Sequence, residues 1–132
     1  MFFDSPSKEF VNQELSPRLL ANLGDAVFEL FERERQVTVS RNAAKMHKKV
    51  QTRVNAITQA LILDQLLEHL NEEENDIVRR ARNVKPSTYR KIDQASYRKS
   101  TAFEALLGYL FLTNPQRLKE ILFLTVNLKD KL

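Results

Sequence analysis

Cysteine and tryptophan are absent from this chain, and only two glycines and four prolines occur among its 132 residues. Without cysteine the chain can form neither disulfides nor thiolate metal sites, and its composition fits a reducing compartment. Because helix-breaking residues are few while leucine, alanine, lysine, glutamate and arginine are common, the sequence predicts a mostly helical protein.

Long hydrophobic runs are also missing. The most apolar stretch, residues 102–112, is too short to cross a bilayer and contains Glu104. The first ten residues, MFFDSPSKEF, lack the basic start and apolar run of a signal peptide. We therefore expect a soluble cytoplasmic protein. Its length and its 42% of apolar residues predict a single all-α domain, residues 1–132, of about six or seven helices.

Capping signals and hydrophobic spacing predict the first two long helices. Ser16 and Pro17 begin a helix that we expect to end near Arg35, with Leu30 on its apolar face. A second pattern runs without interruption over residues 41–61, with apolar residues every three or four positions and lysines on the opposite face. The β-branched residues between these helices, VTVS, predict a short extended piece.

The second half of the chain predicts three more helices. Asn71 caps one that ends near Arg82, and residues 83–95 then form a basic loop. Another helix begins near Ser100, and a last helix follows the Asn-Pro pair at residues 114–115 and runs through Leu128.

Positive charge is gathered in two windows. Residues 41–53 hold five Lys or Arg and no acid, and residues 76–100 hold eight against two Asp. Together the windows carry +11, so the rest of the chain carries −7. This segregation indicates a basic surface that faces a polyanion. The alternative is a set of solvated helix faces and a charged loop.

Two solitary carboxylates stand beside glycines. Asp25 follows Gly24 in LLANLGDAVFELFERE, and Glu104 is the only charge in TAFEALLGYLFL, one turn before Gly108. A glycine inside a helix costs about 1 kcal/mol relative to alanine, which makes sense where a backbone or a ligand comes very close. A buried carboxylate must be paired, protonated or bound to a metal.

Two carboxylates on separate helices can meet in one site. Mg²⁺ is the typical ion for such a pair, since it keeps several waters and takes its other ligands from phosphates. The alternative is that each carboxylate is paired with an arginine or capped by a hydroxyl. His47 and His69 lack a metal-ligand partner four residues away and are expected at the surface.

The two glycine-flanked segments carry a family resemblance. LGDAVFEL followed by FEALLGYLFL resembles the ribonuclease III catalytic domain. The segment RARNVK, followed by a basic loop and YRKSTAFEALLGYLFL, is similar to the Mini-ribonuclease III subfamily, which lacks a double-stranded-RNA-binding domain. The resemblance covers roughly residues 15–128. It implies that Asp25 is the catalytic aspartate and Glu104 the metal-binding glutamate.

Three positions depart from the larger enzymes of this family. Those enzymes have glutamates where this chain has Arg18 and Ala21, and an aspartate where it has Thr101. The subfamily resembled here also has fewer of these carboxylates. We therefore expect only Asp25 and Glu104 as metal ligands, with Glu29 and Glu32 as surface or interface residues.

The resemblance implies a homodimer that cleaves double-stranded RNA with Mg²⁺, or Mn²⁺ as a substitute, and leaves 5′-phosphate and 3′-hydroxyl ends. The subfamily suggests a 23S ribosomal RNA precursor as substrate and leaves open a ribosomal-protein helper. Alternatives are a non-catalytic double-stranded-RNA-binding protein on the same fold and a purely structural helical dimer or adaptor. The candidate RNA-binding residues are the cations of the two basic windows, namely Arg41, Lys45, Lys48, Lys49, Arg79, Arg80, Arg82, Lys85, Arg90 and Lys91.

Overall fold

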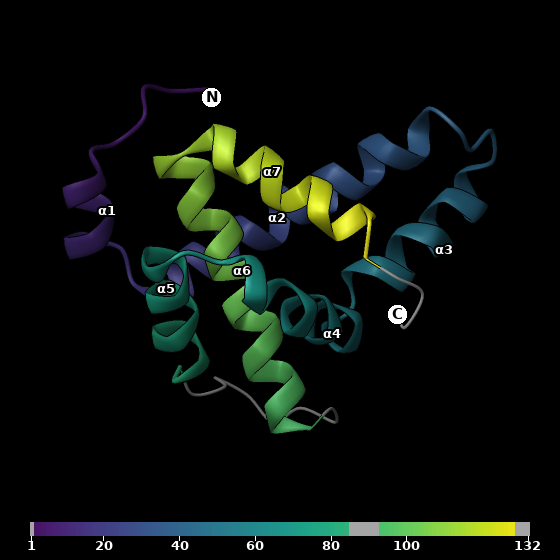
Figure 1. Ribbon diagram of the computed structural model, residues 1–132. Coiled ribbons are helices and arrows are strands. Elements are labelled where there is room, and N and C mark those ends of the chain that lie inside the picture. Colours follow the sequence, from purple (N-terminus) through teal and green to yellow (C-terminus); the bar gives the residue numbers. More distant parts are fainter. Residues whose placement is uncertain (1, 85–92, 129–132) are drawn as a thin grey trace.

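The computed structural model describes residues 2–84 and 93–128, and these fold into seven α-helices and one short 3₁₀ helix (Figure 1). No strand occurs within the described ranges, so the prediction of an all-α fold of six or seven helices is confirmed. The elements are α1 (Lys8–Glu14), α2 (Pro17–Val37), α3 (Ala43–Val54), α4 (Ala56–Leu66), η1 (Leu67–His69), α5 (Glu72–Arg82), α6 (Gln94–Thr113) and α7 (Pro115–Val126).

Helix α6 is the central element of the fold. It packs against α1, α2, α4, α5 and α7 (Figure 1). From Ser100 to Leu110 every residue except Glu104 is buried. Because the helix is apolar on nearly all sides, its side chains are removed from water only when other helices surround it. Even so, no helix in the described part of the chain is long and apolar enough to cross a bilayer.

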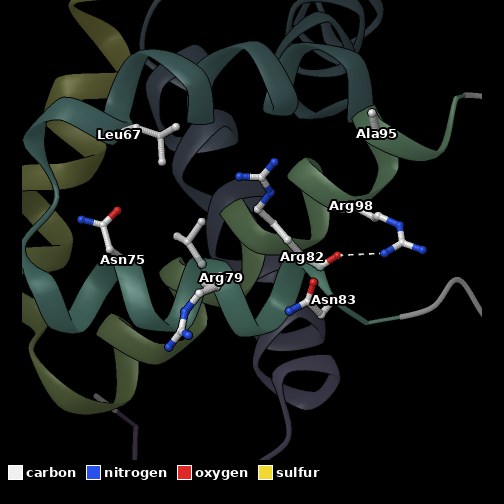
Figure 2. Close-up of a pocket in the computed structure, with 8 residues that line it drawn as sticks. Leu67, Asn75, Arg79, Arg82, Asn83, Ala95 and Arg98 are labelled. Carbon is white, nitrogen blue, oxygen red and sulfur yellow. Dashed lines mark hydrogen bonds between the residues drawn. The ribbon is translucent and has the colours of Figure 1, made fainter.

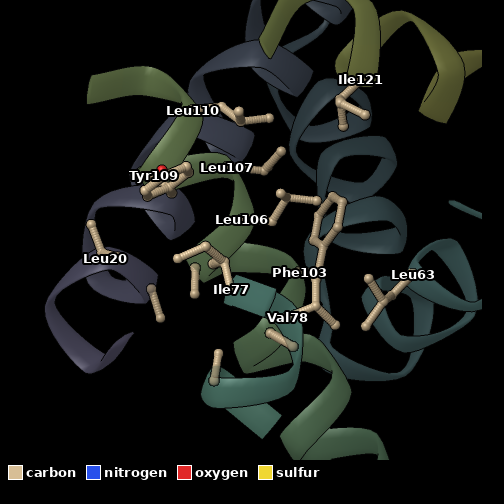
Figure 3. Packing of buried hydrophobic residues seen from close by; sticks show 14 of the residues in the cluster. Leu20, Leu63, Ile77, Val78, Phe103, Leu106, Leu107, Tyr109, Leu110 and Ile121 are labelled. Atoms are coloured by element: carbon tan, nitrogen blue, oxygen red, sulfur yellow. The ribbon is translucent and has the colours of Figure 1, made fainter. Parts of the chain in front are cut away.

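The hydrophobic core is built on this helix. Figure 3 shows Phe103, Leu106 and Leu107 of α6 among side chains from the surrounding helices, including Leu63 of α4 and Ile77 of α5. Each of these five named side chains is at most 3% exposed. The ring of Phe103 also meets Phe28 of α2 edge-on, with a centroid separation of 4.9 Å. Aromatic pairs favour this arrangement.

The contact between α2 and α6 depends on both glycines. A Cβ atom on Gly24 would lie 1.6 Å from the carbonyl oxygen of Glu104, and one on Gly108 would lie 2.0 Å from that of Leu20. Each glycine therefore faces the backbone of the opposite helix. The requirement for a close approach is confirmed, and the approaching group is a backbone. The space beside Gly108 is occupied by α2, so it does not leave a gap next to Glu104.

Several helix boundaries differ from those predicted. The continuous helix over residues 41–61 is broken at Asn55, which ends α3 and caps α4 by accepting a hydrogen bond from the backbone N–H of Thr58. The break changes the helical phase, so Ile57 and Leu61 are exposed although the uninterrupted pattern would have placed them inward. An asparagine side chain that competes for backbone hydrogen bonds favours such a stop.

Two further helix boundaries and the exposure of one residue also differ from the prediction. Helix α6 begins at Gln94, earlier than predicted, where Asp93 accepts from the backbone N–H of Ser96. The predicted extended piece at residues 37–40 is wrong, since α2 continues through Val37 and a turn follows. Leu30 is 61% exposed rather than buried on the apolar face of α2.

A buried ion pair ties α5 to α7. Glu74 completes a capping box with Asn71 and accepts two hydrogen bonds from Arg117, at 2.8 and 2.9 Å. Although burial acts to raise the pKa of Glu74, these hydrogen bonds hold it below its usual value. The carboxylate is therefore ionised in the folded protein, and α5 is fixed against the start of α7.

Replacing either crossing glycine by alanine is expected to destabilise the protein strongly. Gly24→Ala and Gly108→Ala would each force the two backbones apart, at a cost of about 3 kcal/mol or more. Thermal or urea unfolding measures this loss. Asn22→Ala, at an exposed position of α2, is the control, expected within about 0.5 kcal/mol of wild type. Glycine variants that unfold like this control would contradict the account of the crossing.

Candidate functional site

The crossing of α2 and α6 brings the two predicted carboxylate residues together. Gly24 faces the backbone of Glu104 so closely that a methyl group would not fit between them, and Asp25 is the next residue of α2. Residues about eighty positions apart in the sequence are thus neighbours in space. The helices can approach this closely because Gly24 and Gly108 have no side chain.

The two carboxylates have different surroundings. Asp25 is exposed, and within the described ranges its side chain makes no hydrogen bond or ion pair. Glu104 is half-buried, and its Oε2 accepts a hydrogen bond from Gln59 Nε2 of α4 at 3.5 Å. One therefore faces solvent while the other is held by the protein.

This donor set fits a hard cation that keeps most of its water. Nowhere in the described chain do three or more His, Cys, Asp or Glu side chains gather in a way that would hold a metal ion by themselves. A site with one carboxylate on each of two crossing helices and open solvent suits Mg²⁺, which binds through one or two carboxylates together with substrate phosphates. The same set does not suit a closed cage of protein ligands.

The three positions at which the larger enzymes of the family carry further carboxylates supply no additional metal ligand here. Ala21 is buried against the core, and Arg18 is an exposed cation. Thr101 is buried, and its hydroxyl donates to the carbonyl of Tyr97 at 3.0 Å. These side chains leave Asp25 and Glu104 as the carboxylates at the crossing.

Glu32 was expected at the surface or an interface, and this prediction is wrong. Its carboxylate is fully buried and pairs with Arg35 at 2.6 Å and with Arg53 of α3 at 3.3 Å. Arg53 also donates to the carbonyl of Thr125 in α7. The carboxylate is a structural bridge, because a buried charge is tolerated only when it is paired. Glu29 is half-buried and pairs with Arg33.

Helix α3 presents an uncompensated basic face. The candidate cations Lys45, Lys48 and Lys49 of this helix are exposed, as is Arg41 just before it. None of them takes part in an ion pair with another described residue. On the opposite side Val50 is buried and Met46 is half-buried, so the helix is amphipathic as predicted. Their charges are available to a polyanion.

The second basic region lies between α5 and the start of α6. A cavity of about 600 Å³ is lined there by Arg79, Arg82 and Arg98 among other residues (Figure 2). Arg98 donates to the carbonyl of Arg82 at 3.4 Å, and Arg79 pairs with Asp76. Of the predicted cations in this region, Arg82 is exposed, while Arg79 and Arg80 share the charge of one aspartate. The candidates Lys85, Arg90 and Lys91 lie outside the described residues.

Sequence reasoning missed Gln59, which contacts Glu104, and Arg98, which lines the cavity between α5 and α6. Gln59 is the only amide in the mostly apolar stretch AITQALIL, a signal similar to the one that singled out Glu104. Arg98 was counted in the basic window but not assigned a role. Neither position could be placed without the packing of α4 and α5 against α6.

The sequence and fold match known proteins. The family model described as "Ribonuclease III domain" matches residues 18–115. A protein named Mini-ribonuclease 3 from Gloeobacter violaceus is 46% identical over 112 residues, which cover 85% of this chain and 83% of that protein. One of the same name from Clostridium tetani is 37% identical over 131 residues, covering 94% and 87% respectively.

A solved structure supports the same conclusion at the level of the fold. A crystal structure of a protein from Fusobacterium nucleatum superimposes with a TM-score of 0.81 at 31% sequence identity. The match covers 89% of this chain and 96% of that one. The similarity therefore spans the helices that carry both carboxylates and the basic face of α3.

Proposed function

This chain belongs to the ribonuclease III family and is an endoribonuclease, and from that premise we propose that it cleaves double-stranded RNA with Mg²⁺ held by Asp25 and Glu104. The observation that supports the proposal is the glycine crossing, where Gly24, the residue before Asp25, lies against the backbone of Glu104. The family decides for a nuclease over the non-catalytic and purely structural alternatives.

The chemistry of the site is hydrolysis of a phosphodiester. A water oxygen forms a bond to phosphorus while the bond from phosphorus to the 3′ oxygen breaks in line with it, leaving a 5′-phosphate and a 3′-hydroxyl. A bound divalent cation supplies charge neutralisation at the phosphate and activates the water. Asp25 and Glu104 are the residues that would hold this cation, and Mn²⁺ is expected to serve as a substitute.

The protein recognises the charge and shape of the RNA rather than its base sequence. A-form RNA displays phosphates and 2′-hydroxyls across a wide minor groove, and proteins read it mainly through these groups. Arg41 and the three exposed lysines of α3, together with the arginine-lined cavity between α5 and α6, provide the positive surface. We assign a 23S ribosomal RNA precursor as the substrate and the cytoplasm as the place of action, in keeping with the subfamily resemblance and the absence of cysteine.

Removing either metal-binding carboxylate is expected to abolish cleavage. Asp25→Asn and Glu104→Gln should each slow the cutting of a 23S precursor duplex by more than about 100-fold, because loss of an outer-shell partner alone costs 10–100-fold. Gel analysis with Mg²⁺ measures the rate. Glu29→Gln, on the same helix as Asp25, is the control and should cut at the wild-type rate. Wild-type rates for Asp25→Asn or Glu104→Gln would refute the site assignment.

Loss of a cation from α3 is expected to weaken RNA binding without changing the chemical step. Lys48→Ala should raise the Kd for duplex RNA roughly 5-fold at low salt, since one phosphate contact is worth about 1 kcal/mol. Binding is measured without divalent cations, at several salt concentrations. The slope of log K against log salt should fall by about 0.8. Lys8→Ala, outside both basic windows and paired with Glu73, should change neither quantity.

The homodimer that the family resemblance implies has a candidate contact surface. Leu30 of α2 and Phe123 of α7 are 61% and 67% exposed, and both line an apolar groove of about 550 Å³. Glu34 on α2 and Lys119 on α7 also line the groove, so two copies related by a two-fold axis can pair these opposite charges. Exposed apolar surface of this kind is typical of interfaces.

Light scattering tests this dimer. The wild-type protein is expected at twice its 15.4 kDa mass, and Leu30→Glu should shift it towards the monomer by placing a charge in the apolar contact. Ile57→Glu, at a residue of α4 that is 55% exposed, is the matched control and should remain dimeric. A dimer that Leu30→Glu leaves intact would exclude this groove as the interface.

A further inference from the structure

Gln59 is a buried polar side chain in a helix that is otherwise mostly apolar. It lies in α4, where its neighbours Ala60, Ile62 and Leu63 belong to the core, and it is only 1% exposed. A buried amide costs free energy unless its hydrogen bonds are satisfied within the protein. The contacts of Gln59 therefore show what retains it at this position.

The amide nitrogen of Gln59 reaches two acceptors. Nε2 lies 3.0 Å from the carbonyl oxygen of Val54 and 3.5 Å from Oε2 of Glu104. An amide nitrogen carries two hydrogens and the amide oxygen carries none, so two acceptors on the same side fix which end faces Glu104.

The first acceptor belongs to the basic helix. Val54 is the last residue of α3, so the same amide that faces Glu104 also binds the C-terminal end of the helix that presents Lys48. The preceding residue, Arg53, fixes this end independently through Glu32 and the carbonyl of Thr125. The junction of α3 and α4 is therefore held in place from two sides, and Gln59 is held with it.

We propose that Gln59 is a positioning residue that orients the Glu104 carboxylate for the divalent cation and couples it to the end of α3. This inference rests on the proposed function. A donor on Oε2 restricts rotation of the carboxylate and so sets the direction in which it presents its lone pairs. Partners of this kind, one shell behind the ligand, typically change metal affinity or activity 10–100-fold when removed.

Two substitutions remove the donor while keeping the volume of the side chain. Gln59→Leu and Gln59→Met both delete the amide and place an apolar group in an apolar setting. Mn²⁺ binding, measured by calorimetry in the absence of RNA, should weaken about 10-fold in both. The Mg²⁺ concentration for half-maximal cleavage should rise by a similar factor, while the KM for RNA at saturating Mg²⁺ stays at the wild-type value.

The control is a buried polar residue that does not touch the carboxylates. Thr125 is fully buried, and its hydroxyl donates to the carbonyl of Leu122. Thr125→Val removes this hydrogen bond and should lower the melting temperature without changing Mn²⁺ affinity. If the Gln59 variants bind Mn²⁺ as tightly as Thr125→Val does, the proposed role is wrong.

A measurement on the wild-type chain keeps the test independent of how the variants fold. In a ¹⁵N-labelled sample the side-chain amide signals of Gln59 should shift on Mg²⁺ addition. Those of Asn55, which donates to the carbonyls of Gln51 and Thr52, should not shift. Glu104→Gln should abolish the Gln59 shift. If the Gln59 amide signals do not shift on Mg²⁺ addition while the signals of other residues near Glu104 do, the inference is wrong.

The outcomes separate this inference from the proposed function. If the wild-type protein neither binds Mn²⁺ nor cleaves duplex RNA, the proposed function fails and the role of Gln59 fails with it. If the wild type does both and the Gln59 variants match it in metal dependence, only the role of Gln59 is wrong.

Discussion

The fold and the site both depend on the contact of two helix backbones at Gly24 and Gly108. Each glycine faces a carbonyl of the opposite helix at a distance that leaves no room for a side chain. Because α6 is the centre of the hydrophobic core, the position of α2 against it also determines where the surrounding helices can pack. The crossing also brings the turn of α2 that carries Asp25 against the turn of α6 that carries Glu104, which is where we propose the metal site.

Charge is distributed around this crossing in a way that suits the chemistry. Buried charges are paired, as Glu32 is with Arg53 and Glu74 with Arg117, and these pairs fix α3 and α5 in place. The cations of α3 are left exposed and unpaired within the described residues. The protein therefore separates structural charges, which are buried, from the charges that we assign to RNA.

The sequence predicted the parts of this arrangement that local physics determines. The Ser-Pro and Asn-Pro starts, the Asn71 cap and the all-α class follow from capping and propensity, and the structure confirms them. The break at Asn55 was missed because apolar spacing continues through it. The burial of Glu32 was missed because its partner Arg53 lies on another helix, and Gln59 was missed for the same reason. The metal-binding role of Asp25 and Glu104 and the boundaries of a single domain stay predictions.

We propose that Asp25 and Glu104 hold a divalent cation at the glycine crossing. Crystals of the protein soaked in Mn²⁺ and measured at a wavelength where manganese scatters anomalously would show whether they do. We expect an anomalous peak contacted by both carboxylates and otherwise by water. A peak elsewhere, or none at Mn²⁺ concentrations that support cleavage, would contradict it.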